Sequence, residues 1–363
     1  MAKVHLGFIS LESGQYPFYP QWLHDLRGQP GGDLLPYYAQ QLGTIEMTSV
    51  NYRIPLPATT RQWADSVPEG FVMHVKLFGL FAFGSCERSA LPRTALLKLR
   101  SGADPVRLRS LPREALEEVW RCFRAALVPL REQGKLGVVM CQFTPSFAPG
   151  PESYARLRQI CEQCKPSTLA AEFRNPAWGM QEAAAELDRL GVLAVLTDDN
   201  GSHNENNNFR ELPMRLQGRS LGYCRIHRRP LNRETGLICE RVTEEDLAAS
   251  MRPDPRTGRG QGELAREELA EWAALLRRAS AGMTPGGRIY VHVSTIGRNA
   301  SANNVERLRE ALGELAAPWP AAAAGALASE VPEEPGTGPR AGPRRWVAAA
   351  ASVGAGGEEP GDA

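Results

Sequence analysis

The sequence predicts an α/β fold of the (β/α)8 TIM-barrel type. Eight short apolar runs rich in β-branched residues recur along the chain, and amphipathic segments or polar loops follow them. Apolar residues occupy both faces of these runs, as expected for parallel strands covered by helices. A doubly wound open sheet is the competing fold. It is less favoured, because no glycine-rich phosphate loop follows the first run.

The predicted strands follow one another at similar spacing. They are VHLGFIS from Val4, TIEMTSV from Thr44, FVMHVKLF from Phe71, LGVVMCQF from Leu136, TLAAEF from Thr168, VLAVLTD from Val192, LGYCRIH from Leu221 and RIYVHVS from Arg288. The predicted helical segments are 33–42, 59–67, 112–133, 151–164, 180–190, 263–280 and 301–315. Pro112 and Pro151 open two of them, which suits proline in a first helical turn.

Composition sets limits on organisation and function. The chain has 363 residues with 42% hydrophobic and 23% charged, which is globular composition. We expect a barrel over residues 3–315 and an Ala/Pro/Gly-rich, disordered tail over 316–363. A net charge of +1 does not favour nucleic acid as a partner, and no apolar run is long enough to span a membrane. The N-terminus does not read as a secretory signal, and seven scattered cysteines suggest reduced thiols, so we expect a cytoplasmic location.

Polar side chains recur near the carboxyl ends of the predicted strands, where active sites of such barrels lie. They are Glu46, His74, Lys76, Gln142, Glu172, Arg174, Asp198, Arg225, His227, His292 and Ser294. Residues two apart on a strand share a face, so we expect these groups to converge at one mouth. A purely structural network of paired buried charges is the alternative.

The residue types suggest acid/base chemistry on a small polar or anionic ligand. Glu46, Glu172 and Asp198 are candidate acids or bases, and His227 could move protons near neutral pH. Lys76, Arg174 and Arg225 could hold an anion or stabilise developing negative charge.

Metal and phosphate sites are weaker alternatives. His74, His227 and His292 with a carboxylate would supply metal ligands, but no metal-binding spacing is present, so we assign no metal ligand and leave the cofactor open. Arg298 lies in the loop after the last strand, before a helix that begins near Ser301, a common place for phosphate in these barrels. An ordinary capped turn explains that loop equally well.

The chain resembles the YecE-like family, a domain of unknown function. The motifs that carry the resemblance, in family order over about Lys3 to Leu315, are YPFYPQWL, LLPYYAQQLGTIEMTSVNYRIP, PEGFVMHVKLFGL, GKLGVVMCQFTPSF, LAAEFRNPAW, LTDD and YCRIH. The resemblance implies a TIM-like barrel with Tyr52 among its polar positions, beside Glu46, Lys76, Gln142, Glu172, Arg174, Asp198, Arg225 and His227. Asn304 corresponds to a family position on the last helix, and we expect Trp178 to cover the loop after LAAEF. The resemblance implies no reaction.

This chain departs from the family pattern at three places in the expected mouth. The first strand reads GFISLESG instead of a Gly-Thr-Ser-Gly-Trp type, and the last reads HVSTIG instead of ending in Phe-Asn-Asn. Thr48 and Asn51 replace an asparagine and an aromatic residue after Glu46. We therefore consider a hydrolase, lyase or isomerase acting on a small anionic or sugar-like substrate. A catalytically degenerate binding or regulatory barrel is the alternative, and the oligomeric state stays open.

Overall fold

The computed structural model describes residues 1–11, 34–99, 104–198, 208–227, 263–295 and 300–319. The parallel strands are β1 (Lys3–Ile9), β2 (Thr44–Met47), β3 (Val72–Lys76), β6 (Leu136–Phe143), β7 (Leu169–Phe173), β8 (Leu193–Ala194), β9 (Leu196–Thr197), β10 (Leu221–Ile226) and β11 (Arg288–Val293). Arg298 falls outside the described residues, so its predicted role stays a prediction.

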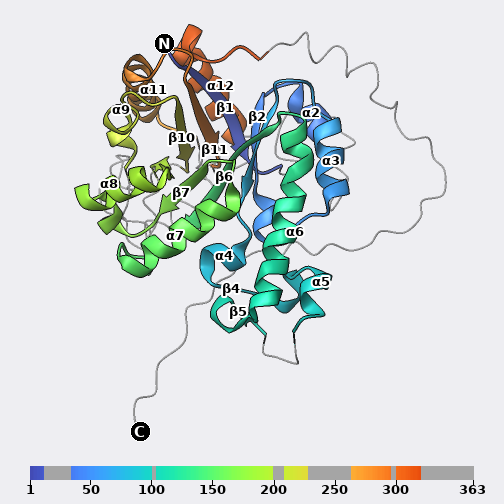
Figure 1. Cartoon of the computed structure of the whole chain (residues 1–363). Helices are drawn as coiled ribbons and strands as arrows, with labels where there is room; N and C mark the ends of the chain where they lie inside the picture. Colours follow the sequence, from blue (N-terminus) through green and yellow to red (C-terminus); the bar gives the residue numbers. More distant parts are fainter. Residues whose placement is uncertain (12–33, 100–103, 199–207, 228–262, 296–299, 320–363) are drawn as a thin grey trace, which may run out of the picture.

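The strands form one parallel sheet that curls into a barrel (Figure 1). Its order is β8-β7-β6-β3-β2-β1-β11-β10-β9. The two ends of this order are consecutive pieces of one run, separated only by Val195: β8 pairs with β7, and β9 pairs with β10. The predicted strand from Val192 therefore splits in two and brings the ends of the sheet together. The predicted eight-fold barrel is confirmed.

Helices surround the barrel, as Figure 1 shows. They are α2 (Leu35–Ala39), α3 (Pro57–Asp65), α4 (Gly79–Phe83), α5 (Arg93–Leu96), α6 (Arg113–Glu132), α7 (Pro151–Cys164), α8 (Gln181–Leu190), α9 (Leu212–Arg215), α11 (Arg266–Gly282) and α12 (Ala300–Leu312). Short 3-10 turns are η2 (Thr48–Asn51), η3 (Arg88–Ala90), η4 (Leu108–Ser110), η5 (Pro176–Gly179), η6 (Phe209–Glu211) and η7 (Gly313–Leu315). Between β3 and α6 the chain adds a small antiparallel pair, β4 (Ser85–Cys86) and β5 (Val106–Arg107). No helix of the described residues has the length and apolar character needed to cross a membrane.

Two apolar cores hold the barrel. The larger one lies between the strands and the outer helices and includes Phe8, Ile45, Phe123 and Trp272. A smaller one fills the barrel interior with Val138, Met140, Ala170, Leu193, Val195, Tyr223 and Tyr290. Side chains two residues apart on a strand point to the same side of the sheet. Residues two positions after members of the smaller core, toward the carboxyl ends of the strands, therefore also point into the barrel interior.

The barrel extends slightly beyond its predicted end at Leu315. Ala317 N donates to Val4 O over 2.7 Å, and Trp319 Nε1 donates to Ala39 O over 2.6 Å. The Trp319 ring also packs edge-on against Phe71, with ring centroids 5.9 Å apart. A Cβ on Gly43 would lie 2.3 Å from Trp319 Cε3, so this contact requires glycine at position 43. The first four residues of the predicted tail are therefore packed on the barrel.

Candidate functional site

Six side chains form one connected network inside the carboxyl-terminal half of the barrel, here called the charged network: Glu46, Lys76, Gln142, Glu172, Tyr223 and Arg225. They come from β2, β3, β6, β7 and β10. Each of them lies two residues after another inward-facing residue of its strand, so its side chain also points into the barrel. Five of the six are residues that the sequence predicted to converge. The structure brings them together.

Arg225 is the centre of the charged network. Its Nη1 donates to Glu172 Oε2 over 2.5 Å, and its Nε lies 3.2 Å from Glu46 Oε2. The guanidinium is 3% exposed and both carboxylates are fully buried. Burial alone would lower the pKa of Arg225, but Glu46 and Glu172 outweigh it and raise that pKa. Arg225 therefore stays charged and is held by two carboxylates, and its predicted contact with a ligand stays a prediction.

Glu172 is held on both oxygens. Oε2 accepts from Arg225, and Oε1 accepts from Gln142 Nε2 over 2.8 Å. Burial alone would raise its pKa, yet the positive charges of Arg225, His227 and Arg174 and the hydrogen bond from Arg225 bring the pKa down to about 2. Glu172 is consequently a carboxylate at neutral pH and has no proton to give, and its predicted role as a base stays a prediction.

Tyr223 belongs to the charged network, and sequence reasoning did not select it. Its hydroxyl donates to Glu46 Oε2 over 2.8 Å. Burial first, and then the charge of Glu46, raises its pKa well above 10. The signal that could have found it is the spacing of two from Arg225, which places both side chains on the same face of β10.

Lys76 and Arg174 are the cations of this region that solvent reaches. Lys76 is partly exposed at the end of β3, and its Nζ donates to Gln142 Oε1 over 2.9 Å. Burial first, and then the charge of Arg225, lowers its pKa, although Glu46, Glu172 and Cys141 act in the opposite direction. The Arg174 side chain is 32% exposed, and its Nε lies 3.8 Å from Glu172 Oε1.

A layer of neutral rings lies below the charged network, one step toward the amino ends of the strands. The His74 ring lies 4.4 Å from the Tyr290 ring and 4.9 Å from the Tyr223 and His292 rings, and its Nδ1 accepts from Val138 N over 3.0 Å. A Cβ on Gly137 would lie 2.5 Å from that nitrogen, so glycine there makes room for the ring. Burial lowers the pKa of His74 to about 3 and that of His292 well below 6.5. No three His, Cys, Asp or Glu side chains are arranged to hold a metal ion in the described part of the chain.

Asp198 does not join the charged network. Its Oδ1 accepts from the backbone N of His227 over 2.8 Å, and its Oδ2 accepts from Trp272 Nε1 of α11 over 3.1 Å. Asp198 therefore links the end of β9 to the end of β10 and to an outer helix. Asp198 lies one residue after the inward-facing Thr197, and its predicted acid/base role stays a prediction. His227 follows β10 and is partly exposed.

Trp178 is a buried packing residue, 2% exposed. Its ring stacks on Phe173 with centroids 4.2 Å apart, and Phe173 in turn stacks on Phe143. The indole Nε1 donates to Phe147 O over 2.6 Å, so its polar atom is already used. Its predicted role in binding substrate stays a prediction. Trp178 does cover the loop after β7, as expected.

Two more predicted binding residues lie outside the charged network. Asn304 of α12 is fully buried; its Oδ1 accepts from Leu264 N over 2.8 Å and its Nδ2 donates to Thr295 Oγ1 over 3.0 Å. It ties α12 to the segment before α11, and its predicted binding role stays a prediction. Tyr52, just after η2, is 67% exposed and its predicted role stays a prediction.

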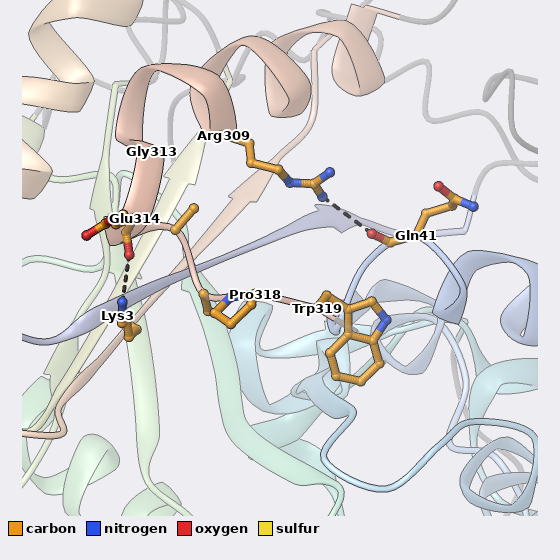
Figure 2. Close-up of a pocket in the computed structure, with 9 residues that line it drawn as sticks. Lys3, Gln41, Arg309, Gly313, Glu314, Pro318 and Trp319 are labelled. Atoms are coloured by element: carbon orange, nitrogen blue, oxygen red, sulfur yellow. Dashed lines mark hydrogen bonds between the residues drawn. The ribbon is translucent and has the colours of Figure 1, made fainter. Parts of the chain in front are cut away.

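A pocket of about 540 Å³ opens at the opposite, amino-terminal end of β1, lined by Lys3, Gln41, Arg309, Glu314 and Trp319 among others (Figure 2). Its two cations are occupied by backbone carbonyls. Lys3 Nζ donates to Glu314 O over 2.6 Å, and Arg309 Nη2 donates to Gln41 O over 3.3 Å. The charged network lies elsewhere. The interacting carboxylates, cations and amide lie in the charged network and not around this pocket, so we place the candidate site at the network.

Fold and site together define the class of protein: a parallel α/β barrel whose carboxyl-terminal interior is filled by paired charges. The chain belongs to the family described as "Protein of unknown function DUF72", whose model matches residues 16–325. This confirms the family that the resemblance to YecE-like proteins predicted.

Individual relatives agree with this assignment. UPF0759 protein YunF of Bacillus subtilis (strain 168) is 25% identical over 144 residues, which is 40% of this chain and 43% of that protein. The crystal structure of a DUF72 family protein from Enterococcus faecalis V583 matches 86% of this chain and 98% of its own at 17% identity and a TM-score of 0.56. A DUF72 family protein from Thermotoga maritima MSB8 matches 86% of this chain and 100% of its own at 19% identity and a TM-score of 0.53. At these identities the structural matches show the shared fold.

Proposed function

We propose that this barrel is an enzyme, of the hydrolase, lyase or isomerase type, that binds a small anionic substrate at its carboxyl-terminal mouth. The observation that carries the proposal is the charged network itself. Removing several charges from water costs several kcal/mol per ion, and apolar packing would fill a barrel interior at lower cost. Charges buried at the end of the barrel where active sites lie are better explained by a ligand than by stability alone.

The two partly exposed basic side chains, Lys76 and Arg174, indicate which class of substrate would bind. Glu46 and Glu172 balance Arg225 and the neighbouring Arg174, so these four groups carry no net charge and leave no excess negative charge to repel an anion. The partly exposed Arg174 and the N–H groups of Lys76 would bind a carboxylate or a phosphate. In this proposal Lys76 and Arg174 touch the substrate, the buried pairs hold them in place, and His227 moves protons at the rim.

Calorimetric titration of the full chain with phosphate, glycolate and pyruvate tests the proposal. We expect at least one of these anions to bind, and Lys76→Met and Arg174→Gln each to weaken that binding tenfold or more. Lys98→Met, at an exposed lysine after α5, is the matched control and should bind like the natural protein. Binding that both site variants leave unchanged would contradict this location. A bound anion that is never turned over would favour the degenerate, ligand-binding barrel.

A further inference from the structure

The partly exposed Lys76 is bound differently from Lys135, which is buried. Within the described residues, its Nζ makes one hydrogen bond, to the amide oxygen of Gln142 at 2.9 Å. Lys135 is buried as well, but its Nζ donates to Ala64 O, Val67 O and Gln133 Oε1. Three acceptors satisfy all three N–H groups of an ammonium ion, whereas one acceptor leaves two of them to solvent or ligand.

The carboxylates that could pair with Lys76 are engaged by other donors. Glu46 accepts from Tyr223 and faces Arg225. Glu172 accepts from Arg225 and Gln142. Gln142 thus donates to Glu172 and offers only its oxygen to Lys76. An amide oxygen accepts a hydrogen bond from a neutral amine as well as from an ammonium ion. This contact therefore does not require charge on Lys76 and leaves the amine lone pair unused.

The surroundings of Lys76 also disfavour its charged form. Burial and the cation Arg225 of β10 lower its pKa, and these outweigh Glu46 of β2, Glu172 of β7 and Cys141 of β6. A lysine that is partly desolvated beside a second cation is a common form of activated amine nucleophile. Lys76 is nevertheless partly exposed, and it lies at the carboxyl end of β3, the end of the strand where ligands of such barrels bind.

We propose that Lys76 forms an imine with the carbonyl carbon of a small 2-oxo acid bound at the barrel mouth, an inference that rests on the proposed function. The neutral Nζ attacks the carbonyl carbon and forms a C–N bond. The carbonyl oxygen takes up one proton and the nitrogen loses one, which gives a neutral carbinolamine. Its hydroxyl then takes up a second proton from solvent and leaves as water, while the nitrogen lone pair forms the C=N bond. The product is a protonated imine. In this proposal the partly exposed Arg174, whose Nε lies 3.8 Å from Glu172 Oε1, contacts the substrate carboxylate.

Reductive trapping tests the proposal directly. The full chain is treated at pH 7 with glyoxylate and cyanoborohydride, which reduces the imine carbon and leaves a stable secondary amine. The chain has five lysines, at positions 3, 76, 98, 135 and 165, so peptide mass spectrometry can follow each one. We expect Lys76 to be modified at least tenfold faster than the exposed Lys98 and Lys165. Unfolding in urea should abolish that advantage, because it depends on the barrel interior.

A parallel experiment uses formaldehyde, which has a carbonyl group but no carboxylate. It tests the reactivity of the amine independently of anion binding. Preferential labelling of Lys76 by both reagents supports the proposal. Preferential labelling by formaldehyde alone would keep the reactive amine but overturn the 2-oxo acid and count against an anion site. Labelling of Lys76 no faster than Lys98 by either reagent would overturn the imine. The anion site would survive that result if the calorimetric titrations still show binding that Lys76→Met weakens.

Discussion

Arg225 Nη1 and Glu172 Oε2 lie 2.5 Å apart inside the barrel, between β10 and β7, two strands that are not paired with each other. Arg225 also reaches Glu46 of β2, so one guanidinium connects three parts of the ring. Buried pairs of this kind are sensitive to the loss of one partner, because the remaining charges are then left in a medium of low dielectric. The predictions below begin from this relationship.

Arg225→Met should destabilise the protein strongly. It leaves Glu46 and Glu172 buried without their cation, and we expect a loss of about 3–5 kcal/mol in the free energy of unfolding. Urea denaturation measures it. The triple variant Arg225→Met with Glu46→Gln and Glu172→Gln should recover most of the loss, since no unpaired charge remains. Arg113→Met, at the 90% exposed end of an ion pair with Glu117, is the control and should change stability by less than about 1 kcal/mol. A similar loss in both single variants would contradict the central role of Arg225.

Glu172 should give the protein a characteristic pH dependence. Its pKa is about 2 in the folded protein against a usual 4.5, so it stabilises the fold fully above pH 4.5. That contribution is lost as the pH falls from 4.5 toward 2. Below pH 4.5 the stability difference between the natural protein and Glu172→Gln should narrow by up to about 1.4 kcal/mol per pH unit.

Urea midpoints of both proteins from pH 7 to pH 3 check this. The buried histidines also lose stabilisation as the pH falls below 6.5, since their folded pKa values are lowered, but both proteins share that effect. A difference that stays constant below pH 4.5 would show that Glu172 does not titrate as described.

Trp178→Phe should lower stability and leave anion binding intact. Phenylalanine keeps part of the aromatic stack but loses the bond from the indole N–H to Phe147 O. We expect a loss of about 1–3 kcal/mol in the free energy of unfolding. Calorimetry should give the same affinity for the best-bound anion as the natural protein. A tenfold weaker affinity with unchanged stability would instead show that Trp178 takes part in binding the anion.

Gly43 and Trp319 should be energetically coupled. Gly43→Ala places a Cβ within 2.3 Å of the indole ring as it now lies, so the ring must move. We expect Gly43→Ala to destabilise the natural protein by about 1–3 kcal/mol and to cost much less when Trp319 is already alanine. A double-mutant cycle by urea denaturation measures the coupling. Strictly additive effects would mean that Trp319 does not pack on this end of the barrel.

The sequence alone determined the barrel and the direction in which its polar residues gather. Both follow from local information: apolar runs of strand length, helical periodicity between them, and polar residues at spacing two near the strand ends. Lys76, Gln142, Glu172 and Arg225 were found in this way, because side-chain direction alternates regularly along a strand.

Only the tertiary structure decided what those residues do. Asp198 lies one position after an inward-facing residue, and it accepts a hydrogen bond from Trp272 of α11. Asn304 accepts a hydrogen bond from Leu264, which is 40 residues away in the sequence. The partner of Arg225 could be Glu46, Glu172 or both, and strand positions around a closed ring settle that choice. Pairing across the barrel depends on distances between residues more than 50 positions apart, and such distances have no local signal in the sequence.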